Sequence, residues 1–519
     1  MKKELNIAVS PSQAYDLSKL KIVVAENLKV EIARIQNIVV RRRSIDARNS
    51  NIRINLGLDV FIDEPLQLTE KPSFSYPDVS KRPQVLIIGA GPAGLFAALH
   101  LIELGFKPVI FERGKTVSER KRDIAAIHGE HIVDPDSNYG FGEGGAGTFS
   151  DGKLYTRSKK RGDVQKILEV FNFHGAQDEI LIDAHPHIGT NVLPRVIVNI
   201  RNSILNAGGE IHFKSRITDL SIKNREVKGV VLKDGSIIEG IAVVLATGHS
   251  SRDIYRMLHE RGILLEAKPF AVGVRVEHPQ ELIDKIQYHG TKRGDYLPAA
   301  TYSFVEQVND RGVYSFCMCP GGLVVPAATA PGELVVNGMS PSDRGGRFAN
   351  SGMVVEIRPD DLPSKRNIQA IFSGLQFQEE IEKLCYKMAG NTQFAPSQRL
   401  ADFVSGRVST NLPESSYRPG LIESPLHEWL PRLVGSRLQE GFKLIGRKTK
   451  GYLTNEAVVL GVESRTSSPI RIPRNLETLE HVQIKRLFPC GEGSGYAGGI
   501  MSSAVDGERV AEMISILYK

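Results

Sequence analysis

The sequence predicts an α/β fold in which a Rossmann-like domain carries an inserted α+β domain and follows a small N-terminal α/β module. Residues 85–114 contain an apolar β-branched run, a glycine turn, a helix and a second strand, which is the order of a parallel-sheet unit. Apolar strands with glycine turns return at 243–248 and 487–506. The chain has 519 residues, 41% hydrophobic and 24% charged, enough for several domains. We expect domains at 1–80, at 81–260 with 471–519, and at 261–470.

The N-terminal module is predicted from short β-rich runs around one helix. Residues 5–9, 37–43 and 51–62 have strand character, and residues 12–27 have helical character. Residues 64–82 are polar, rich in proline and without periodicity, so we expect them to link the module to the rest.

The unit at 85–114 contains the pattern G-x-G-x-x-G at Gly89, Gly91 and Gly94. The first glycine permits the tight turn, the second lets a diphosphate approach the backbone, and the third lets the helix pack closely on the strand. Pro92 suits a first helical position. The helix is expected at 93–104, before Gly105.

An acid follows the second strand of this unit, which is expected at 107–111. Glu112 lies 18 positions after Gly94, close to the spacing of about 20 for a carboxylate that binds ribose hydroxyls. The whole unit therefore predicts a Rossmann-like FAD/NAD(P)-binding domain. The carboxylate argues against NADP, but the unit alone does not separate FAD from NAD.

Between this unit and residue 260 the sequence predicts further helices and strands. A helix is expected over 116–134, and a glycine-dense segment follows at 138–153. So much glycine suggests close backbone approach to a ligand, with a flexible surface loop as the alternative. The later elements are expected to be helices at 164–172 and 195–207 and strands at 210–220, 226–232 and 236–241.

The insertion is predicted to have mixed strands and a long helix. We expect strands at 270–276, 313–318, 332–337 and 352–357, and a helix at 367–388 broken at Gly374. A second G-x-G-x-x-G with its strand, helix and acid is absent from the sequence. A dedicated NAD(P)H domain is therefore not expected, although a nicotinamide nucleotide can still visit the cleft transiently.

Two resemblances narrow the cofactor to FAD. The first unit, the A-T-G strand at 243–248 and the segment 487–506 resemble, in order, the two-dinucleotide-binding flavoproteins of the glutathione reductase type. The resemblance implies that the A-T-G strand closes the FAD domain. It also implies that the last helix points its N-terminus at the flavin and that Glu492 stands where an aspartate usually binds the ribityl chain.

A second resemblance covers longer motifs. Residues 139–154, 319–327, 461–472 and 489–507 are similar to a family of bacterial FAD-dependent dehydrogenases. This resemblance implies the fold and the cofactor but not the substrate. The residues that we expect to contact FAD are Gly89, Ala90, Gly91, Pro92, Ala93, Gly94, Glu112, Arg113, Gly144, Gly145, Gly147, Thr148, Gly152, Thr247, Gly248, Gly491, Glu492, Gly499 and Ile500.

Three residues are candidates for proton transfer or substrate binding. His249 follows the A-T-G strand, in the region where α/β folds place ligands, and the alternative is a surface histidine. Glu463 and Arg465 belong to the polar run VESRTSSP, which suits an oxyanion or, alternatively, a simple turn.

Two further pairs of side chains are predicted to be structural. Arg275 and Glu277 alternate on a strand, and we expect a surface ion pair there, with a shared pocket as the alternative. For Cys317 and Cys319 we expect core positions on one strand face.

Composition excludes several classes of function. His185 and His187 lack further ligands nearby, so no metal site is expected. Four cysteines without C-x-x-C argue against a thiol–disulfide relay of the reductase type. No apolar run approaches about 20 residues, and the N-terminus lacks a signal-peptide core. Membrane insertion is therefore not expected, and the cytoplasm is the expected compartment.

The sequence leaves three functions open. We expect an FAD-dependent oxidoreductase, a dehydrogenase or reductase that acts on a small molecule by hydride transfer. An FAD-dependent monooxygenase is the second hypothesis. The third is an RNA-binding flavoprotein that uses residues 41–43, although a net charge of +7 over this length is mild and nucleic acid is not favoured. The substrate, the electron partner and the oligomeric state are not predicted.

Overall fold

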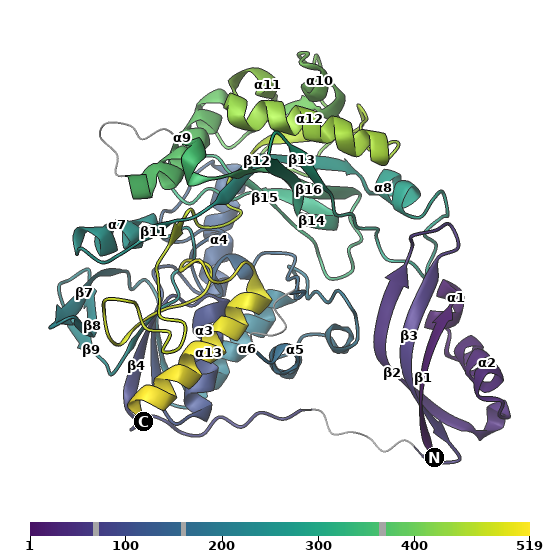
Figure 1. Cartoon of the computed structure of the whole chain (residues 1–519), viewed down its shortest axis with the longest axis horizontal. Coiled ribbons are helices and arrows are strands. Elements are labelled where there is room, and N and C mark those ends of the chain that lie inside the picture. The colour runs from purple at the N-terminus through teal and green to yellow at the C-terminus, as the bar shows by residue number, and fades with distance from the viewer. Residues whose placement is uncertain (66–71, 157–161, 363–369) are drawn as a thin grey trace.

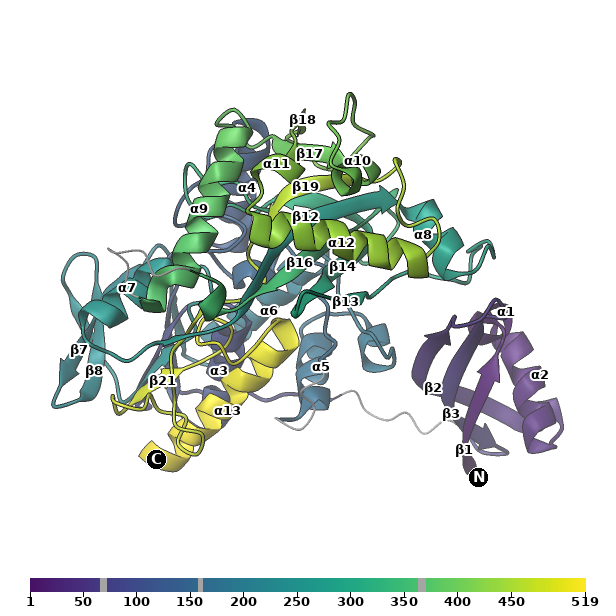
Figure 2. The same ribbon diagram turned by 45° about the horizontal axis from the view of Figure 1, so that its top comes forward.

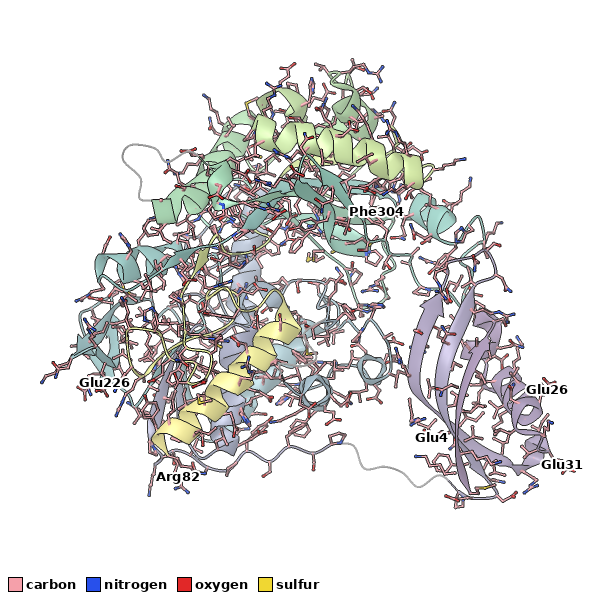
Figure 3. The ribbon with its side chains drawn as sticks, viewed as in Figure 1. Glu4, Glu26, Glu31, Arg82, Glu226 and Phe304 are labelled. Carbon is pink, nitrogen blue, oxygen red and sulfur yellow. The ribbon has the colours of Figure 1, made fainter. Side chains whose placement is uncertain are left out.

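A computed structural model describes residues 1–65, 72–156, 162–362 and 370–519. The chain forms three parts, each built on its own main sheet (Figure 1). Figure 3 locates them by one labelled side chain each: Glu4 in the N-terminal module, Arg82 just before the parallel sheet, and Phe304 in the part with the largest sheet.

The N-terminal module is a three-stranded antiparallel sheet covered by two helices. The strand order is β1 (Lys2–Val9), β3 (Arg53–Ile62), β2 (Ile35–Asp46). Where one helix was expected at 12–27, two form, α1 (Pro11–Tyr15) and α2 (Leu17–Leu28). The break falls at Asp16, whose side chain accepts hydrogen bonds from the backbone N–H groups of Ser18 and Lys19 and so caps α2. Residues 66–71 of the expected linker lie outside the described residues.

A five-stranded parallel sheet forms the second part. Its order is β21 (Leu487–Pro489), β10 (Val243–Leu245), β4 (Gln84–Ile88), β5 (Lys107–Phe111), β6 (Glu210–His212). The strands expected at 85–88, 107–111 and 243–248 are thus central neighbours, and the segment after 487 adds the strand beside β10. The carboxyl ends of β4, β10 and β21 therefore meet at one edge, although they are distant in the sequence.

Two helices pack tightly on one face of the parallel sheet. Helix α3 (Pro92–Glu103) contacts α13 (Ile500–Tyr518) along its length. The two helices appear side by side in Figures 1 and 2. At the crossing, a Cβ added to Gly507 would lie 2.2 Å from the carbonyl oxygen of Ala93. Only glycine permits this approach. The remaining helices of this part are α4 (Val117–Gly129), α5 (Val164–Phe173), α6 (Leu193–Asn206) and α7 (Arg252–Glu260).

The strand expected at 210–220 is in fact two strands. Residues 210–212 form β6 at the edge of the parallel sheet, whereas β7 (Ile217–Lys223) belongs to a separate antiparallel meander with β8 (Glu226–Leu232) and β9 (Ile237–Glu239). The chain turns at Lys214, which has a left-handed φ of 56°. The N–H groups of Lys214 and Ser215 donate to the carbonyls of Gly114 and Glu112, which ties this turn to the end of β5.

An eight-stranded sheet forms the third part. Seven strands lie in the order β13-β14-β16-β12-β19-β17-β18, and β15 pairs with β14. Their bounds are β12 (Phe270–Pro279), β13 (Val305–Val308), β14 (Arg311–Pro326), β15 (Val336–Met339), β16 (Phe348–Ile357), β17 (Ala395–Arg399), β18 (Leu421–Glu423) and β19 (Val458–Glu463). The expected strands at 270–276, 313–318 and 352–357 are longer than predicted, and the one expected at 332–337 starts only at Val336.

Helices cover the outer face of this sheet, and its other face lies over the parallel-sheet part (Figure 1). Helix α12 (Arg432–Lys448) contacts β12, β13, β14 and β16, and α9 (Ser373–Met388) contacts β19. Gly374 lies in the first turn of α9 and does not break it, and residues 363–369 of the expected helix lie outside the described residues. Shorter helices are α8 (Gln280–Gln287), α10 (Leu400–Ser405) and α11 (Leu426–Trp429).

The two segments that connect the second and third parts pair with each other. Strand β11 (Glu266–Ala267) pairs antiparallel with β20 (Ile470–Arg471). Arg43 of the N-terminal module contacts the second part of the chain, where its side chain pairs with Asp183 at 2.7 Å. The domain boundaries at 80, 260 and 470 stay predictions. Within the described ranges, none of the helices combines the length and apolar character needed to cross a membrane.

The crossing of α3 and α13 gives a stability prediction. Gly507→Ala should lower the free energy of unfolding by about 1–3 kcal/mol, because the new Cβ would collide with the Ala93 carbonyl. The matched control is Gly129→Ala at the exposed end of α4, where an added Cβ meets nothing within 4 Å. The control should leave stability unchanged or raise it by up to about 1 kcal/mol. Thermal melts of both variants measure the difference, and equal melting temperatures would contradict the assigned crossing.

Candidate functional site

The G-x-G-x-x-G turn lies between the end of β4 and the start of α3. Gly89 has a φ of 105°, and its N–H donates to the carbonyl of Phe111 at 2.8 Å. A Cβ on Gly94 would lie 2.0 Å from the carbonyl oxygen of Gly89. The first and third glycines are therefore required by the backbone itself.

The second glycine faces open space. A Cβ on Gly91 would meet only the Cα of Gly145, at 4.0 Å. Gly91 is also the N-cap residue of α3, and no side chain caps that helix. The uncapped first turn has free N–H donors and a partial positive charge, which together favour an anion.

The carboxylate of Glu112 joins three separate backbone segments. It accepts hydrogen bonds from the N–H groups of Ala90 at 2.9 Å, Gly114 at 2.9 Å and Gly142 at 3.0 Å. A carboxylate has about four lone-pair sites. One position therefore remains for a further donor, such as a ribose hydroxyl.

A buried arginine braces the glycine-dense segment. Arg120 of α4 is fully buried and donates to the carbonyls of Asn138, Tyr139, Glu143 and Gly145. Burial lowers the pKa of Arg120 to about 10, which still leaves the guanidinium charged at neutral pH. The segment is thus a rigid wall beside Gly91 and not a flexible surface loop. The sequence analysis predicted a helix over 116–134 but did not single out Arg120.

The last helix brings a second uncapped N-terminus to the same place. Helix α13 starts at Ile500 behind Gly499, which has a φ of 140° and provides no side-chain cap. A Cβ on Gly147 would lie 3.3 Å from Ile500 Cγ1 and 3.4 Å from Pro92 Cγ. The short turn 145–147 therefore lies between the starts of α3 and α13. Added Cβ atoms on Gly498 and Gly499, just before α13, and on Gly248, after β10, meet nothing within 4 Å, so each of these glycines has free space beside it.

A further pair missed from the sequence holds the turn before α13. Arg474 donates to Asp506 at 2.6 and 3.0 Å, and Asp506 accepts the N–H of Gly491 at 2.8 Å. Both side chains are buried. Their 32-residue separation leaves no local signal for the contact.

His249 lies at the carboxyl end of β10 and contacts Glu492. Its Nδ1 lies 3.2 Å from Glu492 Oε2, and its Nε2 lies 3.1 Å from the carbonyl oxygen of Arg465. Because both partners are acceptors, the ring donates to both only when both nitrogens carry protons. Burial raises the pKa of Glu492, but the hydrogen bond and the charge of His249 outweigh it, so the net shift is downward. A half-buried histidine held by a carboxylate is suited to exchanging a proton.

Arg465 does not form the open oxyanion site that the sequence suggested. Its guanidinium contacts Glu382 at 2.8 Å and Glu333 at 3.3 Å, and Arg252 completes a buried quartet with the same two carboxylates. Burial raises the pKa of Glu333 to about 7. Burial acts likewise on Glu382, but Arg465 and Arg252 outweigh it and lower that pKa to about 2. The quartet joins α7 to the eight-stranded part, so the guanidinium of Arg465 is used in a structural contact between these two parts.

The predicted surface ion pair between Arg275 and Glu277 is wrong. Both side chains are buried, and Arg275 pairs with Glu463 at 2.6 Å, whereas Glu277 accepts hydrogen bonds from Ser415 and Ser416. Arg275 and Glu277 are two positions apart and share one face of β12. Each nevertheless contacts a different polar partner. Burial raises the pKa of Glu463 to about 7 against the opposing charge of Arg275.

The structure brings most of the expected cofactor residues to one edge of the parallel sheet. Two of them direct their side chains elsewhere. Thr148 donates its hydroxyl to the carbonyl of Glu143 at 2.7 Å, and Arg113 pairs with Asp136 and Asp253. Gly152 packs against residues 188–189, away from the starts of α3 and α13. The residues that surround the open space or its turns are Gly89, Ala90, Gly91, Pro92, Ala93, Gly94, Glu112, Gly144, Gly145, Gly147, Thr247, Gly248, Gly491, Glu492, Gly499 and Ile500.

Comparisons with known proteins agree with an FAD site. Residues 82–126 match a family described as an FAD binding domain, residues 269–466 match one described as FAD-dependent protein, C-terminal domain-like, and residues 1–61 match a domain of unknown function. A protein of Clostridium beijerinckii, named only as uncharacterized, is 40% identical over 96% of this chain and 96% of its own length. The chain belongs to this family of FAD-dependent proteins. Its cofactor is FAD.

Two other known proteins are similar to this chain at lower sequence identity. A thiamine thiazole synthase of Pyrococcus horikoshii is 24% identical over 35% of this chain and 63% of its own length. The structure of a glycine oxidase from Bacillus cereus is similar over 84% of this chain and 96% of that chain, with 14% identity and a TM-score of 0.31.

The room at Gly91 gives a test of the diphosphate position. Gly91→Val should fold normally, because its side chain enters open space, yet it should lose FAD affinity by about tenfold or more since that space is then filled. Flavin absorbance per mole of purified protein measures the effect. Gly129→Val, at an exposed position with equal room, is the matched control and should keep its flavin. Full flavin content in Gly91→Val would place the diphosphate elsewhere.

Proposed function

We propose that the protein is an FAD-dependent oxidoreductase that passes a hydride between the flavin and a small molecule, as a dehydrogenase or reductase. The observation that carries the proposal is that two uncapped helix N-termini, at Pro92 and Ile500, meet at the turn 145–147. FAD, when bound, supplies the redox chemistry, and the protein supplies position, charge and exclusion of water.

The residues divide the binding of FAD between them. The N-terminus of α3 at Gly91 would hold the diphosphate, and the remaining acceptor position of Glu112 would hold a ribose hydroxyl. The N-terminus of α13 would face the flavin ring and stabilise negative charge there. The eight-stranded sheet lies over this edge (Figure 1) and would separate the reaction from water.

His249 would exchange the proton that accompanies hydride transfer. It lies at the carboxyl end of β10, beside Gly248, where an added Cβ meets nothing within 4 Å. Glu492 fixes the ring at one nitrogen and the Arg465 carbonyl fixes it at the other. A positioned acid or base of this kind contributes about 10²–10⁴-fold to a rate.

The hypothesis of an RNA platform at residues 41–43 has little support. Arg41 pairs with Glu4 at 3.0 Å and with Asp59 at 2.8 Å, and Arg43 pairs with Asp183. Two of the three cations are thus neutralised within the chain.

Anaerobic reduction of the flavin tests the proposed function. The holoprotein is mixed without oxygen with NADH, with NADPH and with a panel of small metabolites, and bleaching of the flavin band is timed. Rapid bleaching by one of them supports hydride transfer and identifies the donor, including a nicotinamide nucleotide that binds only transiently. A monooxygenase flavin is also bleached by its nicotinamide donor, so oxygen consumption coupled to oxygenation of a substrate would favour that alternative instead.

The role of His249 gives a separate prediction. His249→Gln should retain FAD but slow the bleaching by the identified donor by about 10²–10⁴-fold, because the proton has no positioned partner. Dithionite, which needs no protein group, should reduce variant and wild type equally. His212→Gln, at an exposed histidine at the end of β6, is the control and should react like wild type. An unchanged rate in His249→Gln would remove the histidine from the mechanism.

A further inference from the structure

Two cysteines and a lysine form a cluster on the eight-stranded sheet that FAD binding does not explain. Lys153 Nζ lies 3.7 Å from Cys317 Sγ and 3.6 Å from Cys319 Sγ. We call these three residues the dithiol cluster. As the sequence predicts, Cys319 lies in the core and both thiols point to one side of the strand, whereas Cys317 is only half-buried.

The backbone of β14 is irregular at the dithiol cluster. The register with β16 shifts between Phe316 and Cys319, and Cys317 has a left-handed φ of 48°. A non-glycine residue rarely adopts this conformation, and irregular strands of this type redirect side chains. Cys319 Sγ donates to the carbonyl oxygen of Cys317 at 3.3 Å, and the side chain of Cys319 also hydrogen-bonds that of Cys317. Both sulfur atoms therefore point to one ammonium group.

The charges around the cluster make the two thiols unequal. The hydrogen bond from Cys319 lowers the pKa of Cys317 well below its usual range, and the nearby charges of Lys153 and Arg275 act in the same direction. The same hydrogen bond and burial raise the pKa of Cys319. Arg275 Nη2 lies 3.7 Å from Cys319 Sγ and 2.8 Å from the Cys317 carbonyl oxygen. Of the two thiols, Cys317 is therefore the one that loses its proton more readily.

The lysine remains charged although it is enclosed. Burial alone would lower the pKa of Lys153, but Cys317, Cys319 and Asp151 outweigh it and raise that pKa. Asp151 Oδ2 lies 2.9 Å from Lys153 Nζ and also 3.4 Å from Arg344 Nη2, so its charge is shared between two cations. An ammonium group is thus available beside the thiolate.

Two members of the cluster are partly exposed, whereas Cys319 is as buried as the other two cysteines. Cys317 is half-buried, and the side chain of Lys153 is 34% exposed. Cys385 and Cys490 are fully buried, and burial raises the pKa of both thiols. Thiolate character and access govern the oxidation of cysteine. Cys317 thus differs from Cys385 and Cys490 both in exposure and in the direction of its pKa shift.

We propose that Cys317 and Cys319 form an oxidisable pair whose substrate is a hydroperoxide. The Cys317 thiolate attacks the peroxide, so that an S–O bond forms, the O–O bond breaks, and the leaving oxygen takes a proton from the Lys153 ammonium. The sulfur of Cys319 then attacks Cys317. An S–S bond forms, the S–O bond breaks, and the released hydroxyl leaves as water with the proton of Cys319. Two thiols are oxidised, and one peroxide is reduced to an alcohol or water.

Oxidation of the holoprotein with one equivalent of hydrogen peroxide tests the proposal. The protein is then denatured, alkylated and mapped by mass spectrometry. We expect the peptide with Cys317 and Cys319 to lose two hydrogen atoms and escape alkylation, while Cys385 and Cys490 are alkylated fully. Oxidation of all four cysteines at one rate, or of none, would overturn the proposal.

Variants separate the roles within the cluster. Cys319→Ser should stop at Cys317 with one added oxygen atom, trapped by a sulfenic acid reagent, and Cys317→Ser should not react. Lys153→Met should slow the oxidation by about tenfold or more, Lys153→Arg should restore part of the rate, and Lys233→Met, at an exposed turn, should leave it unchanged. Retained FAD content confirms that each variant folds. An unchanged rate in Lys153→Met would contradict the assigned role of the ammonium group.

Discussion

The three hydrogen bonds to the carboxylate of Glu112 are the constraint on which the site depends. They bind the turn at Ala90, the end of β5 at Gly114 and the glycine-dense segment at Gly142 into one unit. Arg120 fixes the same segment from its other side. These contacts hold the turn, the end of β5 and the glycine-dense segment together beside the start of α3.

The local elements of the dinucleotide site could be predicted from the sequence because each carries its own signal. The strand before Gly89, the helix behind Pro92 and the acid at Glu112 follow from hydrophobic pattern and glycine spacing. The A-T-G strand and the last helix follow from resemblance to known flavoproteins. The structure adds that all of these segments meet at one edge of a parallel sheet.

The long-range polar contacts could not be predicted in the same way. Arg275 pairs with Glu463, which is 188 residues away in the sequence, and Arg465 pairs with Glu382, which is 83 residues away. A charged residue in a strand normally indicates a solvent-facing position, so its burial follows only from the pairing of β12 with β19. The same reason applies to Cys317, because a left-handed residue within β14 leaves no trace in the hydrophobic alternation.

Hydrogen exchange of the apoprotein and the FAD-loaded protein tests the central claim most directly. The amides of residues 91, 93–95, 144–148 and 499–503 should exchange more slowly in the loaded protein, by about tenfold or more, whereas those of β1 and β3 in the N-terminal module should not change. Protection at both helix starts would agree with the cofactor lying between them. Protection at neither start, in a protein that holds its flavin, would contradict the account.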